Sequence, residues 1–210
     1  MYKKHELEMW LSWMDELSCN NYVVIDDFIG GNLQHDIKSF FHKNDALFTK
    51  AGIGALNKHT IRHDIRGDYT FWLEQEKDQW LSEFWQIAEH AVQMFNRYCF
   101  LGLAGSEFHL AKYPPGAFYK KHLDQFKNRN NRVITWVIYL NHNWQKGDGG
   151  ELELFLKNGE TKLIDPLAAR CIMFMSANIP HRVLLSNKNR FSLTGWLLKH
   201  PAPVGKFIEY

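Results

Sequence analysis

The 210-residue sequence predicts an α+β fold in which N-terminal helices support a jelly roll or a β-barrel. Two observations lead to this fold class. Before about residue 105 apolar residues recur with helical spacing, and after it short apolar runs alternate with turn signals. No internal repeat or flexible linker interrupts the chain. We therefore expect a single domain over 1–210, with helical support and loops in 1–105 and a jelly-roll core in 106–200.

Helical periodicity is confined to the N-terminal half. Apolar residues of Glu6–Leu17 and of Lys77–Tyr98 recur on one side of a helix, and a shorter helix is expected over Leu33–Lys43. Tyr22–Ile25 is a short β-prone run, and the glycine-bearing residues 44–70 predict loops. The helices would pack over one face of a sheet.

The C-terminal half predicts a series of short β-strands. Each apolar run is bounded by Gly, Pro, Asn or Ser residues that favour turns. The expected strands are Phe108–Tyr113, Tyr119–His122, Arg132–Leu140, Glu151–Phe155, Thr161–Ile164, Cys171–Met175, His181–Leu185 and Arg190–Leu198. Short strands in this number are typical of a jelly roll or a barrel.

Composition and charge argue against several classes of protein. Hydrophobic residues make up 45% of the chain and aromatic residues 15%, so a disordered protein is not expected. A formal net charge of +2 gives no reason to expect a strongly basic nucleic-acid-binding face. Cys19, Cys99 and Cys171 are widely spaced, which argues against a zinc–thiolate site and favours a cytoplasmic location. No secretory h-region or long apolar run predicts contact with a membrane.

The spacing His122-Leu123-Asp124 indicates a metal site. Because alternate residues of a strand share a face, the imidazole and the carboxylate would lie side by side. His181, at the start of a later apolar strand, is the best candidate for a third ligand. Two histidines and one carboxylate form the facial triad of non-haem iron(II) oxygenases. The tripeptide alone is weak evidence, since the chain has 11 histidines.

Arg190 strengthens the hypothesis of an oxygenase site. It opens a strand that also contains Phe191, Leu193 and Trp196, and burying a guanidinium among such residues is costly unless its charge is matched. Its planar fork can bind a carboxylate through two parallel hydrogen bonds. The alternative is an arginine that faces solvent at the edge of a sheet.

Together, these features and several others resemble the 2-oxoglutarate oxygenases of the prolyl hydroxylase group, especially the oxygen-sensing hydroxylases and their bacterial relatives. Order and spacing match as well as identity. The motifs are Ile65-Arg66-Gly67-Asp68, Tyr113-Pro114, His122-Leu123-Asp124, Tyr139-Leu140-Asn141, Gly149-Gly150, Pro180-His181 and Arg190 through Trp196. The resemblance implies a double-stranded β-helix, a form of jelly roll, with supporting helices.

The resemblance also implies roles for single residues around the metal. The triad would bind iron(II), and Arg190 would pair with the distal carboxylate of 2-oxoglutarate. Tyr139 would hydrogen-bond to the same carboxylate, Thr194 would line that pocket, and Tyr113 would lie near the cosubstrate and the metal. The implied cofactors and cosubstrates are iron(II), 2-oxoglutarate and O2, with ascorbate as a candidate reductant.

On the substrate side, Trp196 resembles an aromatic wall beside the target proline. Asp68 and Arg132 resemble a family pair, and we expect them to form an ion pair that positions substrate-binding loops. The stretch Gln125–Asn131 departs from the family, because it is polar and basic where the oxygen-sensing members are rich in glycine.

The function implied by the resemblance is hydroxylation of a prolyl residue in a protein substrate, with release of succinate and carbon dioxide. If the chain is bacterial, the candidate substrate is elongation factor Tu; neither a membrane nor nucleic acid is expected as a partner. Three alternatives stay open. They are an oxygenase that acts on nucleic acid or a small molecule, a non-catalytic jelly-roll binding module, and a cupin-like metalloenzyme that works without 2-oxoglutarate.

Overall fold

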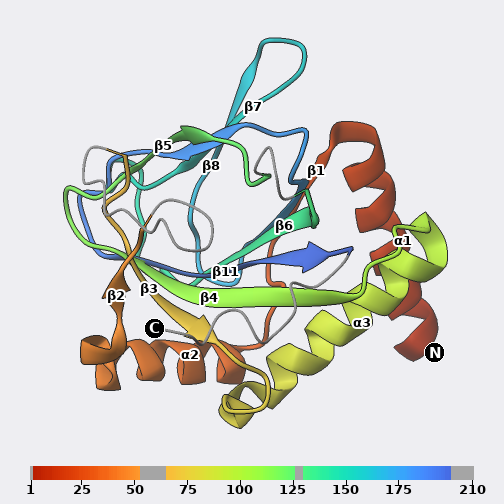
Figure 1. The fold of residues 1–210 in the computed structure, drawn as a ribbon, viewed down its shortest axis with the longest axis horizontal. Helices are drawn as coiled ribbons and strands as arrows, with labels where there is room; N and C mark the ends of the chain where they lie inside the picture. The colour runs from red at the N-terminus through yellow and green to blue at the C-terminus, as the bar shows by residue number, and fades with distance from the viewer. Residues whose placement is uncertain (1, 53–64, 126–129, 200–210) are drawn as a thin grey trace.

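The structure is a computed structural model that describes residues 2–52, 65–125 and 130–199 (Figure 1). The helices are α1 (Tyr2–Asn20), α2 (Gly31–Lys43) and α3 (Ser82–Cys99), with 3₁₀ turns η1 (Asp45–Leu47) and η2 (Gln79–Leu81). One sheet contains β1 (Tyr22–Ile25), β2 (Thr49–Lys50), β3 (Tyr69–Leu73), β4 (Gly105–Tyr113), β6 (Arg132–Tyr139), β9 (Cys171–Met175) and β11 (Arg190–Leu198). The other contains β5 (Tyr119–His122), β7 (Leu152–Phe155), β8 (Thr161–Ile164) and β10 (His181–Val183).

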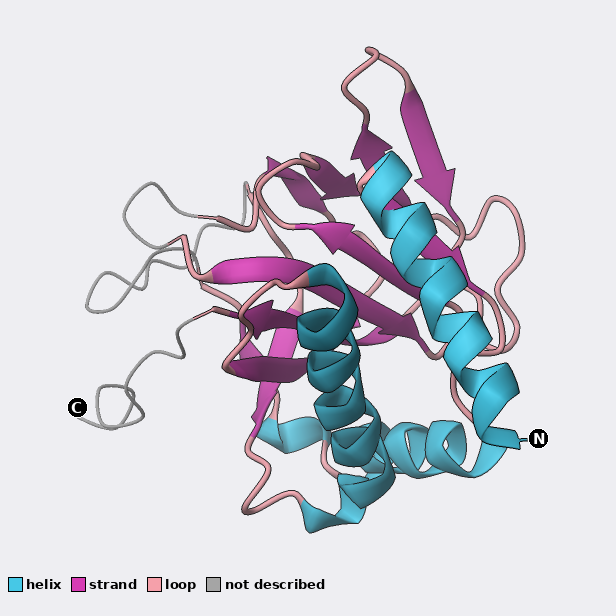
Figure 2. Cartoon of the chain, turned by 90° about the vertical axis from the view of Figure 1, so that its right-hand side faces the viewer, coloured by secondary structure: helices cyan, strands magenta, loops and turns pink. Residues whose placement is uncertain are grey.

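The two sheets form the layers of a jelly roll, and the helices cover the outer face of the larger sheet (Figures 1 and 2). The larger sheet has seven strands in the order β1-β9-β6-β11-β4-β3-β2, and the smaller has four in the order β5-β10-β7-β8. The strand pairs are antiparallel. The N-terminal half therefore supplies strands as well as helices, because β1, β2 and β3 extend the larger sheet.

Each strand predicted after residue 106 is present, with ends that shift by a few residues at most. The three predicted helices are also present, although the last begins at Ser82 after a separate 3₁₀ turn. Strands β2 and β3 were not predicted: β2 lies within the segment 44–70 that was expected to be loops, and β3 begins at its end. The burial pattern of β3 does not alternate cleanly, since Trp72 is 50% exposed and Phe71 is half-buried. Periodicity alone therefore gave no strand signal there.

Alternation along the central strands divides the core into two apolar clusters. Leu193 and Leu197 of β11 belong to the cluster that packs under the helices. Tyr139 and Val137 of β6 belong to the second cluster, between the two sheets. Because successive side chains of a strand point to opposite faces, residues 190, 192, 194 and 196 of β11 face this inter-sheet space.

Trp136, at the centre of β6, connects the helices to the larger sheet. Its ring centroid lies 5.5 Å from that of Phe28, 6.2 Å from that of Phe84 and 5.8 Å from that of Phe108. Of these three rings only Phe84 belongs to a helix, α3, so its contact with Trp136 packs this helix against the sheet. In the part of the chain that the structure describes, no helix combines the length and the apolar character needed to cross a membrane.

Candidate metal and cosubstrate site

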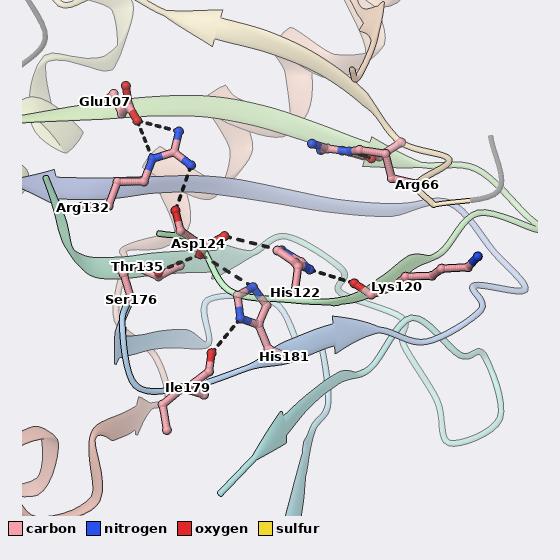
Figure 3. A network of polar contacts seen from close by, with 11 residues as sticks. Arg66, Glu107, Lys120, His122, Asp124, Arg132, Thr135, Ser176, Ile179 and His181 are labelled. Carbon is pink, nitrogen blue, oxygen red and sulfur yellow. Dashed lines mark hydrogen bonds and ion pairs between the residues drawn. The ribbon is translucent and has the colours of Figure 1, made fainter. Parts of the chain in front are cut away.

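His122, Asp124 and His181 meet between the two sheets (Figure 3). Strands β5 and β10 are neighbours, and their register places His122 opposite His181. Asp124 follows β5 by two residues. One potential ligand atom from each of the three residues lies within 4.8 Å of the others. Asp124 Oδ1 is 3.4 Å from His122 Nε2, and Oδ2 is 3.6 Å from His181 Nε2. The structure thus brings together the three residues that the sequence analysis selected.

Main-chain carbonyls orient both imidazoles. Nδ1–H of His122 donates to the carbonyl of Lys120 at 2.8 Å, and Nδ1–H of His181 donates to the carbonyl of Ile179 at 3.1 Å. In this tautomer the lone pair is on Nε2, the nitrogen that faces Asp124 in each case. The ring of Tyr119 stacks on His122 with the centroids 3.7 Å apart and fixes the plane of that imidazole.

The protonation states in this cluster suit a divalent cation. Burial would raise the pKa of the Asp124 carboxyl, but the imidazoles of His181 and His122 lower it well below its usual value. Burial lowers the pKa of His181 to about 4. At neutral pH the cluster therefore contains an ionised carboxylate and a neutral His181, which are the forms that bind metal.

Arg190, Tyr113, Tyr139 and Thr194 lie together on the inner face of the larger sheet. Arg190 is only 3% exposed, so the alternative of a solvent-facing arginine is wrong. The guanidinium carbon of Arg190 is 4.9 Å from the ring centroids of both tyrosines. Thr194 Oγ1 lies 3.1 Å from the hydroxyl of Ser192, which accepts a long 3.4 Å contact from Arg190 Nη1.

This group of residues fits a dicarboxylic cosubstrate. The Tyr139 hydroxyl is buried and has no hydrogen-bond partner among the described residues. Burial raises its pKa to about 12, so it is a donor at neutral pH. Within the same described ranges, no carboxylate lies within ion-pair distance of Arg190. A bound carboxylate would give both groups a partner.

The surroundings of Gly150 explain why the second residue of the Gly149-Gly150 motif is a glycine. Its carbonyl accepts a hydrogen bond from Arg190 Nε at 2.8 Å. A Cβ at this position would lie 2.9 Å from Arg190 Cδ and 2.9 Å from Ser186 Oγ, and φ is +77°. Only glycine combines this close approach with a left-handed backbone. The motif therefore allows the chain to hold the buried guanidinium in place.

Trp196 lies at the opposite end of β11 and is packed by polar side chains. The guanidinium carbon of Arg132 is 3.3 Å from its ring centroid, and the imidazole of His109 stacks on it at 5.5 Å. Trp72 lies 4.9 Å from His109. Trp196 Nε1 and His109 Nδ1 are both buried without a hydrogen-bond partner in the described ranges. Two adjacent rings thus carry polar atoms that the described part of the chain does not satisfy.

The predicted ion pair between Asp68 and Arg132 is wrong. Arg132 pairs with Glu107, with Nη2 2.7 Å and Nε 2.8 Å from Oε1, whereas Asp68 forms a two-pronged pair with Arg66. Strand order explains the change of partner. The order of the strands is β6, β11, β4, β3, and Arg132 is on β6. Glu107 is on β4, opposite Trp196 of β11. Asp68 precedes β3, which is one strand farther from β6.

Four further residues surround this site and were not predicted from the sequence: Glu107, His109, Thr135 and Ser176. Glu107 and His109 are an even number of residues from Tyr113 along β4, and Thr135 is an even number from Tyr139 along β6. Each therefore lies on the same face of its strand as a predicted site residue, and the spacing could have identified it. Ser176 could not have been found in this way, because its contact depends on how β9 and β6 pair. Of the polar and basic stretch that departs from the family, 126–129 lie outside the described residues.

Comparison with known proteins gives consistent matches. Residues 108–198 match the 2OG-Fe(II) oxygenase superfamily. Human prolyl hydroxylase EGLN3 is 32% identical over 191 residues, which cover 83% of this chain and 77% of that protein. The Caenorhabditis elegans hypoxia-inducible factor prolyl hydroxylase is 28% identical over 193 residues, and the chain spans only 26% of its length. The crystal structure of a Pseudomonas putida prolyl-4-hydroxylase matches with a TM-score of 0.83 at 31% identity, covering 91% of this chain and 100% of that chain.

Proposed function

Because the chain belongs to the prolyl hydroxylase family of 2-oxoglutarate–iron(II) oxygenases, we propose that it hydroxylates a prolyl residue in a protein substrate. The fold is the double-stranded β-helix of this family with supporting helices, as the sequence predicted. 2-Oxoglutarate would be converted to succinate and carbon dioxide. The finer statements of residue roles, substrate and location below are part of the same proposal.

The observation that carries the proposal is the placement of two groups in one inter-sheet space. Nε2 of His122, Nε2 of His181 and one oxygen of Asp124 converge and would hold iron(II). Among the described residues, Arg190 has no carboxylate partner and the Tyr139 hydroxyl has no acceptor, and both would bind the distal carboxylate of 2-oxoglutarate. Iron(II), when bound, supplies the redox chemistry that joins O2 reduction to decarboxylation of the cosubstrate.

The chain itself would supply orientation and exclude water. Arg190 fixes one end of the cosubstrate, and such positioning lowers a barrier by several kcal/mol, by order of magnitude. Tyr113 stays protonated, because burial raises the pKa of its hydroxyl well above the usual value, so it can donate a hydrogen bond beside Arg190. Val137, Ile172 and Phe174 line the same space with apolar side chains, and Phe174 packs 4.7 Å from His181. Thr194 would complete the lining of the cosubstrate pocket.

At the other end, Trp196 would form the wall against which the target proline packs. Arg132 would hold that ring in place, while Asp68 would act through Arg66 on the segment that enters β3. The interface would be protein to protein, and we propose elongation factor Tu as the first substrate to test if the chain is bacterial. This specific partner rests on the family resemblance alone.

We further propose that 1–210 form one oxygenase domain that works in a reducing cytoplasm. Cys19, Cys99 and Cys171 are all free. Free thiols are the usual state in the cytosol, whereas secreted proteins tend to oxidise them. Three unpaired cysteines support this location without assigning them a role.

The test is turnover by the purified protein with iron(II), 2-oxoglutarate and ascorbate. We expect succinate, and a mass gain of one oxygen on a proline of elongation factor Tu or of a member of a proline-peptide panel. The variants His122→Ala and Asp124→Ala should lose iron and turnover together. Turnover on a methylated base, with none on any peptide, would replace the prolyl assignment by a nucleic-acid one. Absence of both iron binding and succinate would favour a binding module.

A further inference from the structure

Asp124 is held differently from the two histidines. His122 and His181 lie on paired strands, but Asp124 follows the end of β5 and has no strand partner. Its carboxylate is instead contacted by the hydroxyl of Thr135, whose Oγ1 is 2.7 Å from Oδ2. Ser176 Oγ lies 2.9 Å from Thr135 Oγ1 (Figure 3). Asp124 is 5% exposed, Thr135 1% and Ser176 0%.

The hydrogen bonds in this group run in one direction. An ionised carboxylate can only accept, so the single proton of the Thr135 hydroxyl must point at Asp124 Oδ2. The Thr135 oxygen is then left to accept, and Ser176 is the donor. The order Ser176 to Thr135 to Asp124 follows, and each bond in such a chain strengthens the next.

We propose that Thr135, supported by Ser176, is a positioning residue that keeps Asp124 monodentate toward the metal, with Oδ1 as the ligand atom. This inference rests on the proposed function. Thr135 occupies Oδ2, while no side-chain hydroxyl is bonded to Oδ1 among the described residues. A facial triad needs one oxygen from its carboxylate, because a second would take one of the three positions left for cosubstrates.

The placement of the two hydroxyls supports a positioning role. Thr135 is on β6 of the larger sheet, and Ser176 directly follows β9 of the same sheet. The backbone of Ser176 donates to the carbonyl of Val133 at 3.0 Å, which ties the two segments together. Since β5 and β10 belong to the smaller sheet, these hydroxyls join the carboxylate of the metal cluster to the sheet that carries Arg190, in addition to the packing of Phe174 on His181. The metal cluster and the Arg190 group are thereby held in a fixed position relative to each other.

The experiment uses Mn(II), which binds such sites without turnover. Thr135→Val keeps the shape of the side chain and removes the hydroxyl, Thr135→Ser keeps the hydroxyl, and Thr161→Val is a control on an exposed strand of the smaller sheet. We expect the dissociation constant of 2-oxoglutarate from the Mn(II)-loaded protein to rise about tenfold or more in Thr135→Val, with Thr135→Ser and Thr161→Val close to wild type. A crystal structure of Mn(II)-loaded Thr135→Val should show both oxygens of Asp124 on the metal.

Ser176→Ala gives a second, milder test if Thr135→Val does not fold. It should weaken 2-oxoglutarate binding in the same direction by about threefold, because Thr135 keeps its own hydrogen bond. If the wild-type protein binds Mn(II) and 2-oxoglutarate and both variants bind them equally well, with Asp124 still monodentate, the positioning role is wrong and the proposed function stands. If the wild-type protein binds neither, the proposed function itself is wrong, and this inference is lost with it.

Discussion

Arg190 and Trp196, near the two ends of strand β11, point to the same face of the sheet but have different surroundings. At one end, Arg190 is enclosed by Tyr113, Tyr139 and the carbonyl of Gly150, all of which belong to the motifs of the family. At the other, Trp196 is enclosed by Arg132 and His109, and the partner of Arg132 is not the one that the family pattern predicts. The proposed cosubstrate end is therefore built from motif residues, whereas at the proposed substrate end the residues that support Arg132 and Trp196 are Glu107 and His109, which the motifs do not include.

This difference is expected if the two ends bind different kinds of molecule. One cosubstrate serves the whole family, so the Arg190 end has little freedom to vary. A protein substrate differs from one enzyme to the next, and Glu107 and His109 lie where such variation would act. Substitutions at or beside the two ends of β11 should therefore have separable effects.

The largest effect is expected from Arg190→Ala. Loss of the guanidinium removes the charge that would match the cosubstrate, so succinate formation should fall by about a thousandfold or more. Affinity for iron(II) should stay near that of the wild type, because Arg190 belongs to the larger sheet and both histidines to the smaller one. Unchanged turnover would instead indicate a cupin-like enzyme that does not use 2-oxoglutarate.

Gly195→Ala, next to Trp196, should have the largest effect on stability, because β4 leaves no room for a Cβ at this position. An added Cβ would lie 2.1 Å from Phe108 Cδ1 and 2.3 Å from the carbonyl oxygen of Glu107. Such overpacking costs about 3 kcal/mol, which corresponds to roughly 6–12 °C in Tm for a domain of this size. Gly31→Ala is the control, since nothing lies within 4 Å of the position that its added Cβ would occupy. Equal melting temperatures in calorimetry would show that the sheet relaxes at Gly195.

Glu107→Gln should affect the substrate end alone. Without the carboxylate, Arg132 is less firmly held over Trp196, so the KM for a peptide or protein substrate should rise about threefold to tenfold. The KM for 2-oxoglutarate should not change. Asp68→Asn is the matched comparison, because Asp68 pairs with Arg66 instead. If only Asp68→Asn raised the substrate KM, the assignment of Glu107 as the support of Trp196 would be wrong.

His109→Phe should leave the fold in place at pH 7 and change only how the stability of the metal-free protein depends on pH. Burial lowers the pKa of His109 from 6.5 to about 3. As pH falls below 6.5, the unfolded chain binds a proton that the folded protein does not, so folding loses stability. Between pH 7 and pH 5 this loss is about 2 kcal/mol for one such group. Urea unfolding at the two pH values should show a smaller loss for His109→Phe, and an equal loss would mean that His109 is protonated in the folded state.

Most of the fold could be predicted from the sequence, because each strand after residue 106 has its own apolar pattern and turn. Strand β3 could not, since its residues are partly exposed without alternation. At the site, spacing and strand context identified His122, Asp124, His181 and Arg190, and the resemblance added Tyr113, Tyr139, Thr194 and Trp196. The partners of Arg132 and Asp68 were not identified, because an ion pair depends on strand order and register, which no motif encodes. Ser176 depends on the same tertiary information.

The three proposed metal ligands are held by different kinds of group, and these groups differ in whether a mutation can remove them. Each histidine is held in its tautomer by a peptide carbonyl two positions earlier in the chain, at Lys120 and Ile179. A peptide carbonyl is present whichever residue occupies the position, so substitutions there leave that support in place. Asp124 relies on two hydroxyl side chains that single codon changes can remove. Sequence drift in this lineage should therefore be tolerated beside the imidazoles and selected against at Thr135 and Ser176.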